Sequence, residues 1–110
     1  KGAPAKEQLL AVADRTVRIW NFDTGVCVRT LAGHTDSVRC MASLSCEFPD
    51  APLGLLASAS LDKTIRIWRP DTGECLQLLV GHTESVQGLA AVAAGCLASA
   101  SLDGTVRLWR

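Results

Sequence analysis

The chain has 110 residues, of which 48% are hydrophobic and 20% are charged, a composition typical of a globular domain and unlike that of a disordered tail. The 11 Lys and Arg residues balance the 11 Asp and Glu residues, so the formal net charge is zero. This balance argues against a binder of nucleic acid or of an anionic membrane, because both need a clustered basic excess. The longest weakly apolar stretch, residues 88–102, is shorter than the ~20 residues of a membrane-spanning helix.

The five cysteines have irregular spacings and include no Cys-x-x-Cys pair, so neither a zinc ribbon nor a redox dithiol is indicated. The first residues include no initiator Met and no apolar signal-peptide core, so we expect the chain to be a fragment that begins inside a longer protein. Without a secretion signal, reduced thiols and a cytoplasmic or nuclear location are expected.

Alternation of aliphatic and polar residues with a period of two predicts a series of short strands. Turn residues, such as Asp103-Gly104, lie between them. No segment has a convincing helical period, and only the run 90–94 is ambiguous. The chain is therefore predicted to be all-β, built from short antiparallel meanders. In chain order, the strands are expected near residues 9–12, 16–20, 27–31, 38–43, 55–59, 64–69, 75–79, 86–91, 96–100 and 105–109.

A strand motif that ends in tryptophan recurs along the chain. Residues 16–20 read Thr-Val-Arg-Ile-Trp, residues 64–68 read Thr-Ile-Arg-Ile-Trp, and residues 105–109 read Thr-Val-Arg-Leu-Trp. Gly-His-Thr likewise occurs at 33–35 and again at 81–83. Such repetition indicates copies of one structural unit, each of which buries its hydrophobic faces against its neighbours.

A further motif, Leu-Ala-Ser-Ala-Ser-Leu-Asp, occupies residues 56–62 and again residues 97–103. The interval between Gly-His and this motif is longer in the first copy, because that copy contains an extra stretch with two prolines. We expect a loop insertion at 45–54, since an insertion that leaves every other spacing unchanged is one that a surface loop tolerates.

Together, Gly-His, Leu-Ala-Ser-Ala-Ser-Leu-Asp and Thr-Ile/Val-Arg-Ile/Leu-Trp resemble the WD40 repeat, and the resemblance covers about residues 8–110. The Asp that usually follows the Trp is replaced by Asn21, Arg69 and Arg110. The resemblance implies a partial WD40 β-propeller of about 2.5 blades, each a four-stranded antiparallel meander, from a larger, usually seven-bladed propeller. It divides the chain into a flexible N-terminal segment at 1–7, a partial blade at 8–32, a repeat with the insertion at 33–80, and a repeat that lacks its last strand at 81–110.

The resemblance also implies a relay of hydrogen bonds that runs from Trp to Ser to His to Asp in each full repeat. An indole only donates, whereas a hydroxyl and a neutral imidazole both donate and accept, so a carboxylate ends such a chain. Ser, His and Asp also form hydrolase triads, but here they occur twice in phase, each copy is coupled to a Trp, and no Gly-x-Ser-x-Gly elbow occurs. A structural role is therefore expected for two sets: His34, Ser58, Asp62 and Trp68, and His82, Ser99, Asp103 and Trp109.

Other patterns also receive structural interpretations. Asp-Thr-Gly at 23–25 and 71–73 is the triplet of aspartic proteases, but each copy lies between two strands, where a hairpin turn explains it. His34 and His82 are expected in different blades, so no metal site is predicted. The sequence contains no phosphate-binding glycine loop, so no cofactor is predicted either. Recurrent arginines are expected to lay their stems on the sheets and to extend their guanidinium groups to water or acids: Arg18, Arg66 and Arg107.

The resemblance to the WD40 repeat implies a non-catalytic scaffold for protein–protein interaction, and the residue patterns show no enzymatic site. The alternative is the WD40 portion of a multidomain enzyme, or of a ubiquitin-ligase or signalling protein, whose catalytic part lies outside the chain. The family resemblance implies that other proteins bind the face formed by the Gly-His turns and their neighbours. It also implies that further blades, from the same chain or from other copies, close the propeller. The candidate partner-binding residues are Thr35, Asp36, Arg39, Leu61, Thr83, Glu84, Gln87 and Leu102.

Overall fold

The computed structural model describes residues 7–10, 15–21, 24–44, 54–70, 72–93 and 96–109. Within these ranges the chain forms ten strands and no helix, which confirms the predicted all-β class. The strands are β1 (Glu7–Leu10), β2 (Val17–Asn21), β3 (Cys27–Leu31), β4 (Val38–Leu44), β5 (Leu55–Ser60), β6 (Thr64–Arg69), β7 (Glu74–Val80), β8 (Val86–Ala93), β9 (Cys96–Ser101) and β10 (Val106–Trp109). Outside the described residues lie positions 1–6 of the expected N-terminal segment, 11–12 of the first predicted strand and 45–53 of the expected insertion.

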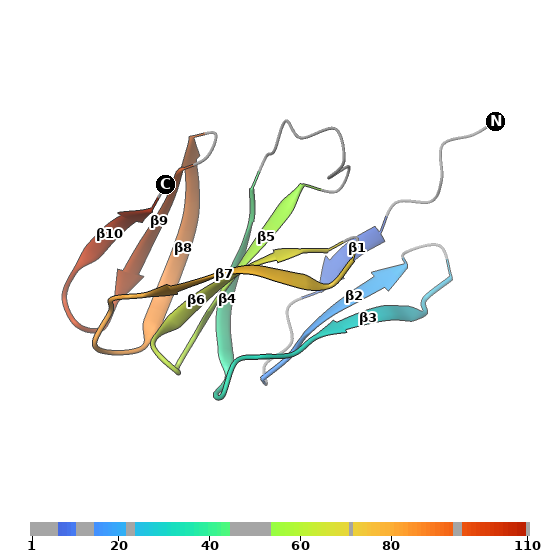
Figure 1. The fold of residues 1–110 in the computed structure, drawn as a ribbon, viewed down its shortest axis with the longest axis horizontal. Coiled ribbons are helices and arrows are strands. Elements are labelled where there is room, and N and C mark those ends of the chain that lie inside the picture. The colour runs from blue at the N-terminus through green and yellow to red at the C-terminus, as the bar shows by residue number, and fades with distance from the viewer. Residues whose placement is uncertain are drawn as a thin grey trace.

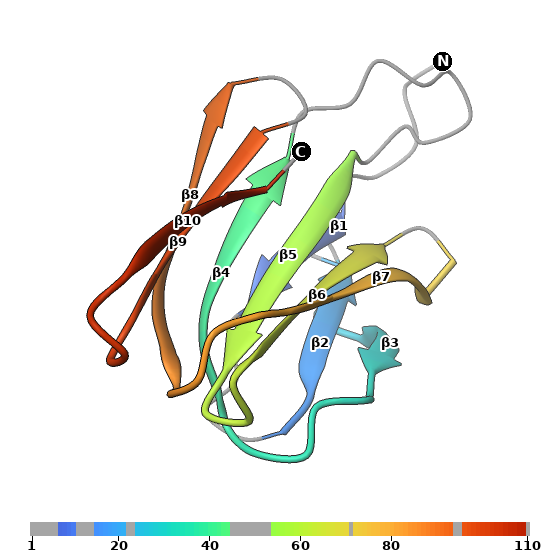
Figure 2. The ribbon, with the colours of Figure 1, turned by 60° about the vertical axis from the view of Figure 1, so that its left-hand side comes forward.

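The strands form three antiparallel sheets that follow one another along the chain. β1, β2 and β3 form the first sheet, β4 to β7 form the second, and β8, β9 and β10 form the third. In Figures 1 and 2 the sheets stand side by side in chain order, with the N-terminal sheet at one end and the C-terminal sheet at the other. This is the arrangement of an open, partial propeller.

The predicted strands all occur, and their ends agree with the structure to within about two residues. The first strand differs most, because it begins at Glu7 rather than at residue 9. Its pairing explains the difference, since Glu7 lies opposite Asn21 at the end of β2. The ambiguous run at 90–94 continues β8 as far as Ala93. Cross-strand pairing, which the alternation of residue types does not specify, therefore sets where these strands begin and end.

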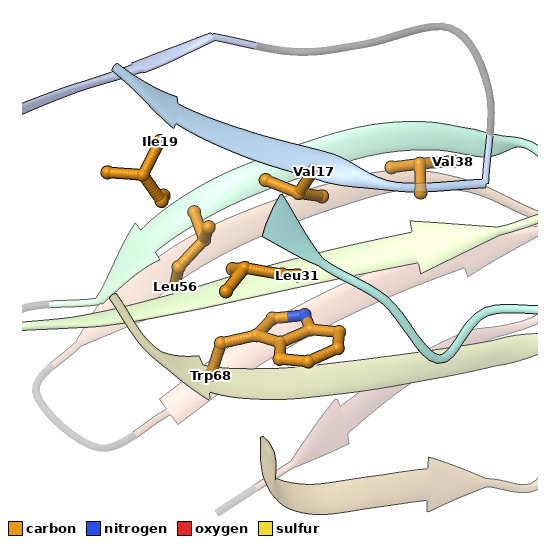
Figure 3. Packing of buried hydrophobic residues seen from close by; sticks show 6 residues of the cluster. All are labelled: Val17, Ile19, Leu31, Val38, Leu56 and Trp68. Carbon is orange, nitrogen blue, oxygen red and sulfur yellow. The ribbon is translucent and has the colours of Figure 1, made fainter. Parts of the chain in front are cut away.

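One hydrophobic core fills the space between the first and second sheets (Figure 3). The period of two places Val17 and Ile19 on the same face of β2, opposite Trp68 of the second sheet. Burial of each such side chain contributes roughly 1.5–3 kcal/mol, so this contact holds the two sheets together. The members of the cluster, none more than 7% exposed, are Val17, Ile19, Leu31, Val38, Leu56 and Trp68.

A second core joins the second and third sheets. Its small residues, Ala57 and Ala59 of β5, let the two sheets approach closely. The half-buried ring of Trp109 packs against the same cluster from the third sheet. The buried members are Ala57, Ala59, Ile65, Ile67, Val86 and Leu97.

The face of the third sheet that points away from the second sheet is not covered by another sheet of the described residues. Val106 and Leu108 of β10 occupy the repeat positions that Ile65 and Ile67 occupy in β6. Ile65 is 0% exposed and Ile67 is 5% exposed, whereas Val106 is 70% exposed and Leu108 is 62% exposed. The same apolar strand pattern is thus covered in the second sheet and uncovered in the third.

Candidate functional site

Several connections between strands lie along one edge of the sheets, the lower edge in Figures 1 and 2. The Leu61 amide donates to the Ser37 carbonyl oxygen at 2.9 Å, and the Leu102 amide donates to the Ser85 carbonyl oxygen at 3.0 Å. The two full repeats therefore tie neighbouring connections together in the same way. We call this edge the loop edge, and it is formed by residues 32–37, 61–63, 81–85 and 102–105.

A chain of hydrogen bonds runs from the second sheet to the first pair of these connections. Trp68 Nε1–H donates to Ser58 Oγ at 2.8 Å, and Ser58 Oγ lies 2.7 Å from His34 Nε2. His34 Nδ1 lies 2.9 Å from Asp62 Oδ2. Because an ionised carboxylate only accepts, Nδ1 carries the imidazole proton, and Nε2 of the neutral ring accepts from the Ser58 hydroxyl. Each polar atom of this relay thereby has a partner.

The third sheet contains the same relay. Trp109 Nε1–H donates to Ser99 Oγ at 2.8 Å, and Ser99 Oγ lies 2.7 Å from His82 Nε2. His82 Nδ1 lies 3.0 Å from Asp103 Oδ2. The tryptophan is the point of difference, since Trp109 is half-buried whereas Trp68 is buried. The second relay is therefore a matched copy of the first in a more exposed setting.

The Asp62 carboxylate is held by several donors. It accepts from the Thr35 amide at 2.9 Å and from both the hydroxyl and the amide of Thr64. Burial by itself would raise the pKa of Asp62. The hydrogen bonds from Thr64, Thr35 and His34 favour the charged form more strongly, so the pKa lies below its ordinary value. The ionised carboxylate is thus the stable form, and it joins the two connections.

The Asp103 carboxylate repeats this arrangement. It accepts from the Thr83 amide at 3.0 Å and from the hydroxyl and the amide of Thr105. The hydrogen bond from the Thr105 side chain, followed by that from His82, holds the pKa of Asp103 well below its usual range, against the opposing effect of desolvation. Both repeats therefore end their relays at an ionised carboxylate.

Sequence reasoning missed four hydroxyl groups that complete these turns. Ser60 Oγ donates to the Asp36 carbonyl oxygen at 3.0 Å and accepts from the Asp62 amide at 3.0 Å. The third sheet has the same two bonds, made by Ser101. A signal was present, because Ser-x-Asp-x-Thr occurs in both turns and side-chain oxygens at such spacing accept from the turn backbone. The missed residues are Ser60, Thr64, Ser101 and Thr105.

The candidate partner-binding residues gather on the loop edge and on the adjacent ends of β4 and β8. Arg39 is exposed on β4 and donates from Nη2 to Gln87 Oε1 of β8 at 3.3 Å. Leu102 is 68% exposed, whereas Leu61 is half-buried. The other members are exposed on the connections between sheets: Thr35, Asp36, Thr83 and Glu84.

Two arginines have partners that the sequence did not predict. The guanidinium groups of Arg66 and Arg107 donate to the carbonyl oxygens of Gly33 and Gly81, at 3.1 Å and 3.2 Å, and Arg107 is exposed to solvent, as expected. A signal was present in the sequence, because each Gly-His is followed in the same repeat by a Thr-x-Arg. Arg18 is exposed in the first sheet.

The serine of each Ser-His-Asp set is buried and is not accessible to a substrate. Ser58 is 0% exposed, and its hydroxyl oxygen already accepts a hydrogen bond from the indole N–H of Trp68, so a substrate carbonyl has no path to it. His34 and His82 belong to separate relays, as the repeat spacing predicts. Among the residues that the structure describes, no three His, Cys, Asp or Glu side chains gather in a way that could hold a metal ion.

Two further observations concern the cysteines and the hydrophobicity of the described residues. Cys27, Cys40, Cys75 and Cys96 are free thiols, and burial raises the pKa of the Cys40 thiol. In the described part of the chain, no helix has the length and hydrophobicity needed to cross a membrane.

Known proteins contain the same repeat. The family described as WD domain, G-beta repeat matches residues 25–69 and 73–110, which together make up more than half of the chain and contain both relays. The chain belongs to the WD40-repeat family. Its WD40 fold superimposes on the WD40 beta propeller domain of Doa1 with a TM-score of 0.82 and 25% sequence identity. That match covers 94% of this chain and 33% of the other, which confirms the predicted partial propeller.

Curated WD40 relatives match shorter stretches. An uncharacterized WD repeat-containing protein of Schizosaccharomyces pombe is 49% identical over 47 residues, which is 43% of this chain and 11% of that protein. The nuclear distribution protein PAC1 of Gibberella zeae is 55% identical over 40 residues, which is 34% of this chain and 9% of that protein. The matches thus span about a tenth of the length of these relatives.

Proposed function

We propose that the chain is part of a non-catalytic scaffold for protein–protein interaction, and that its loop edge binds partner proteins. The observation that carries this proposal is the hydrogen-bonded frame that occurs twice beneath that edge. In both full repeats the frame fixes an exposed connection, through the Thr35 amide bound to Asp62 and the Thr83 amide bound to Asp103. A surface that is fixed before binding loses little conformational entropy on association, which favours a docking role.

The proposed contact residues combine apolar and charged groups. Leu102 is exposed, and Leu61 is half-buried in the equivalent turn. Large side chains at the centre of a contact are the usual anchors of an interface. Arg39 donates across the two sheets to Gln87, and its planar guanidinium has further donors for a carboxylate or carbonyl group of the partner. The other proposed contacts are Thr35, Asp36, Thr83 and Glu84.

A further WD40 blade is the proposed cover of the open face of the third sheet. The equivalent residues of the second sheet, Ile65 and Ile67, are buried by the sheet that follows. Val106 and Leu108 are likewise aliphatic, but they are exposed. The covering blade belongs either to the same chain of a longer protein or to another copy of this chain.

A second candidate role is the WD40 portion of a multidomain enzyme, or of a ubiquitin-ligase or signalling protein, whose catalytic part lies elsewhere in the protein. The matches cover only 9–11% of the relatives, so most of each relative lies outside the matched region, which supports this second role. The flanking reading frame separates the two roles, because a catalytic domain there favours the second. A cytoplasmic or nuclear location is also proposed, on the basis of the free thiols in the described chain.

The proposed function is tested by substitutions in the full-length protein and quantitative binding of the proteins that it captures. Arg39→Ala and the pair Leu61→Ala with Leu102→Ala are expected to weaken binding by roughly tenfold or more, as loss of an interface anchor does. The matched control is Leu76→Ala with Leu78→Ala, two exposed leucines on the outer strand β7. Unchanged binding by the loop-edge variants, or an equal loss in the control, would contradict the proposal.

A further inference from the structure

Arg66 and Arg107 occupy the same position in two successive repeats and make the same contacts. Arg66 lies on β6 with its guanidinium carbon 6.0 Å from the centre of the Trp68 ring, and Arg107 lies on β10 at 5.9 Å from Trp109. These distances are within the range of cation–π attraction. Each guanidinium therefore has an aromatic ring on its own strand.

The same guanidinium groups reach across to the connection that enters their sheet. Nη2 of Arg66 donates to the carbonyl oxygen of Gly33 at 3.1 Å, and Nη2 of Arg107 donates to that of Gly81 at 3.2 Å. Nη1 of Arg66 also lies 3.5 Å from Cys75 Sγ of β7. Gly33 lies between the first and second sheets, and Gly81 lies between the second and third. Each arginine thus links an inter-sheet connection to the sheet that follows it.

The same contacts involve the glycine that precedes histidine in both repeats. A Cβ placed on Gly33 would lie 2.9 Å from Cζ of Arg66, and one placed on Gly81 would lie 3.1 Å from Cζ of Arg107. The backbone does not require glycine there, because neither residue has a positive φ, unlike Gly73 in the β6–β7 turn. A side chain at either position would have to displace the guanidinium group, which is the flexible end of the arginine, and would therefore disturb the contacts of that group.

We propose that Arg66 and Arg107 are positioning residues, each of which holds an inter-sheet connection in place through its guanidinium group, an arrangement that we call the clamp. We also propose that Gly33 and Gly81 are glycines because the guanidinium groups lie directly against them. Each clamp acts on the residue directly before the relay histidine. It therefore sets the placement of the exposed connection that follows, including Thr35 in the first repeat. The proposal does not depend on which partner the loop edge binds.

A cycle of thermal-unfolding measurements on variants of the full-length protein tests the clamp. Gly33→Ala is expected to lower the Tm by about 4–8 °C, because the added methyl group displaces the guanidinium of Arg66. In an Arg66→Ala background the same change is expected to leave the Tm unchanged or to raise it, since alanine at an unstrained position reduces the entropy of the unfolded chain. An equal fall in Tm in both backgrounds would overturn the proposal. Arg66→Lys, which keeps the charge but loses the planar fork, replaces Arg66→Ala if the latter does not fold.

Amide hydrogen exchange separates a clamp from a general loss of stability. Arg66→Ala is expected to speed exchange of the Thr35 amide roughly tenfold or more, relative to that of Thr83, because local opening of one connection does not open the other. Arg107→Ala is expected to have the reverse effect. Equal acceleration of the Thr35 and Thr83 amides in either variant would overturn the proposal, because it would mean that the arginines only support the fold as a whole.

Discussion

Removal of the Ser58 hydroxyl tests the buried relay most sharply. Ser58→Ala leaves two partners without a hydrogen bond, the indole N–H of Trp68 and Nε2 of His34, which now lie 2.8 Å and 2.7 Å from the hydroxyl oxygen. The site is closed to water, because Ser58 is fully buried. Each unsatisfied buried group costs about 1–3 kcal/mol, so the free energy of unfolding is expected to fall by about 2–6 kcal/mol.

The assay is urea unfolding of the full-length protein, followed by circular dichroism, with two substitutions in the same chain for comparison. Ser43→Ala, at an exposed position on β4, is expected to change the free energy of unfolding by less than about 0.5 kcal/mol. Ser99→Ala is expected to cost less than Ser58→Ala, because Trp109 is only half-buried. A cost for Ser58→Ala no larger than that for Ser43→Ala would refute the reasoning, since it would mean that the relay adds nothing to stability.

The remaining predictions concern the two turns beneath the loop edge. Asp62→Ala is expected to lower the Tm, because His34, Thr35 and Thr64 lose their common acceptor; an unchanged Tm would count against the relay. Because the pKa values of Asp62 and Asp103 are lowered in the folded state, their contribution is complete above the ordinary Asp pKa of about 4 and is lost as the pH falls below it. The Tm of the protein is therefore expected to fall below about pH 4, and less steeply in the Asp62→Asn, Asp103→Asn double variant; parallel profiles would contradict this assignment. Lys63 and Gly104 occupy equivalent turns and both have a positive φ, 77° and 84°, which favours glycine. Lys63→Gly is therefore expected to raise the free energy of unfolding by about 1 kcal/mol, and Gly104→Ala is expected to lower it by a similar amount. Changes of the opposite sign, measured by calorimetry, would contradict this account of the turn.

Repetition is the reason why much of the fold could be predicted from one sequence. Each tryptophan motif predicted a strand with two faces, and the structure places Val17 and Ile19 in one core and Ile65 and Ile67 in the other. The resemblance to the WD40 repeat implied which Ser, His, Asp and Trp residues form the relays, and the structure brings each set within hydrogen-bonding distance. A single copy of Ser, His and Asp would not have excluded a catalytic triad.

The features that the sequence did not predict depend on how elements pair and pack. The early start of β1 follows from the pairing of Glu7 with Asn21. The bond from Arg66 to Gly33 joins residues far apart in the chain, and alternation along a strand gives the face of an arginine but not its partner. The exposure of Val106 is another feature that the sequence did not predict. Val106 and Ile65 have equivalent sequence positions, and their exposure differs because another sheet lies against Ile65, whereas no sheet within the described ranges lies against Val106.

The most direct test of the account measures the molar mass of the 110-residue chain by size-exclusion chromatography with light scattering. The central claim is that the chain is an open part of a propeller, whose exposed Val106 and Leu108 need a covering sheet. The chain on its own is therefore expected to fold only as an assembly of two or more copies, or to remain unfolded or aggregated. A soluble monomer of 11.6 kDa with a cooperative unfolding transition would contradict that claim.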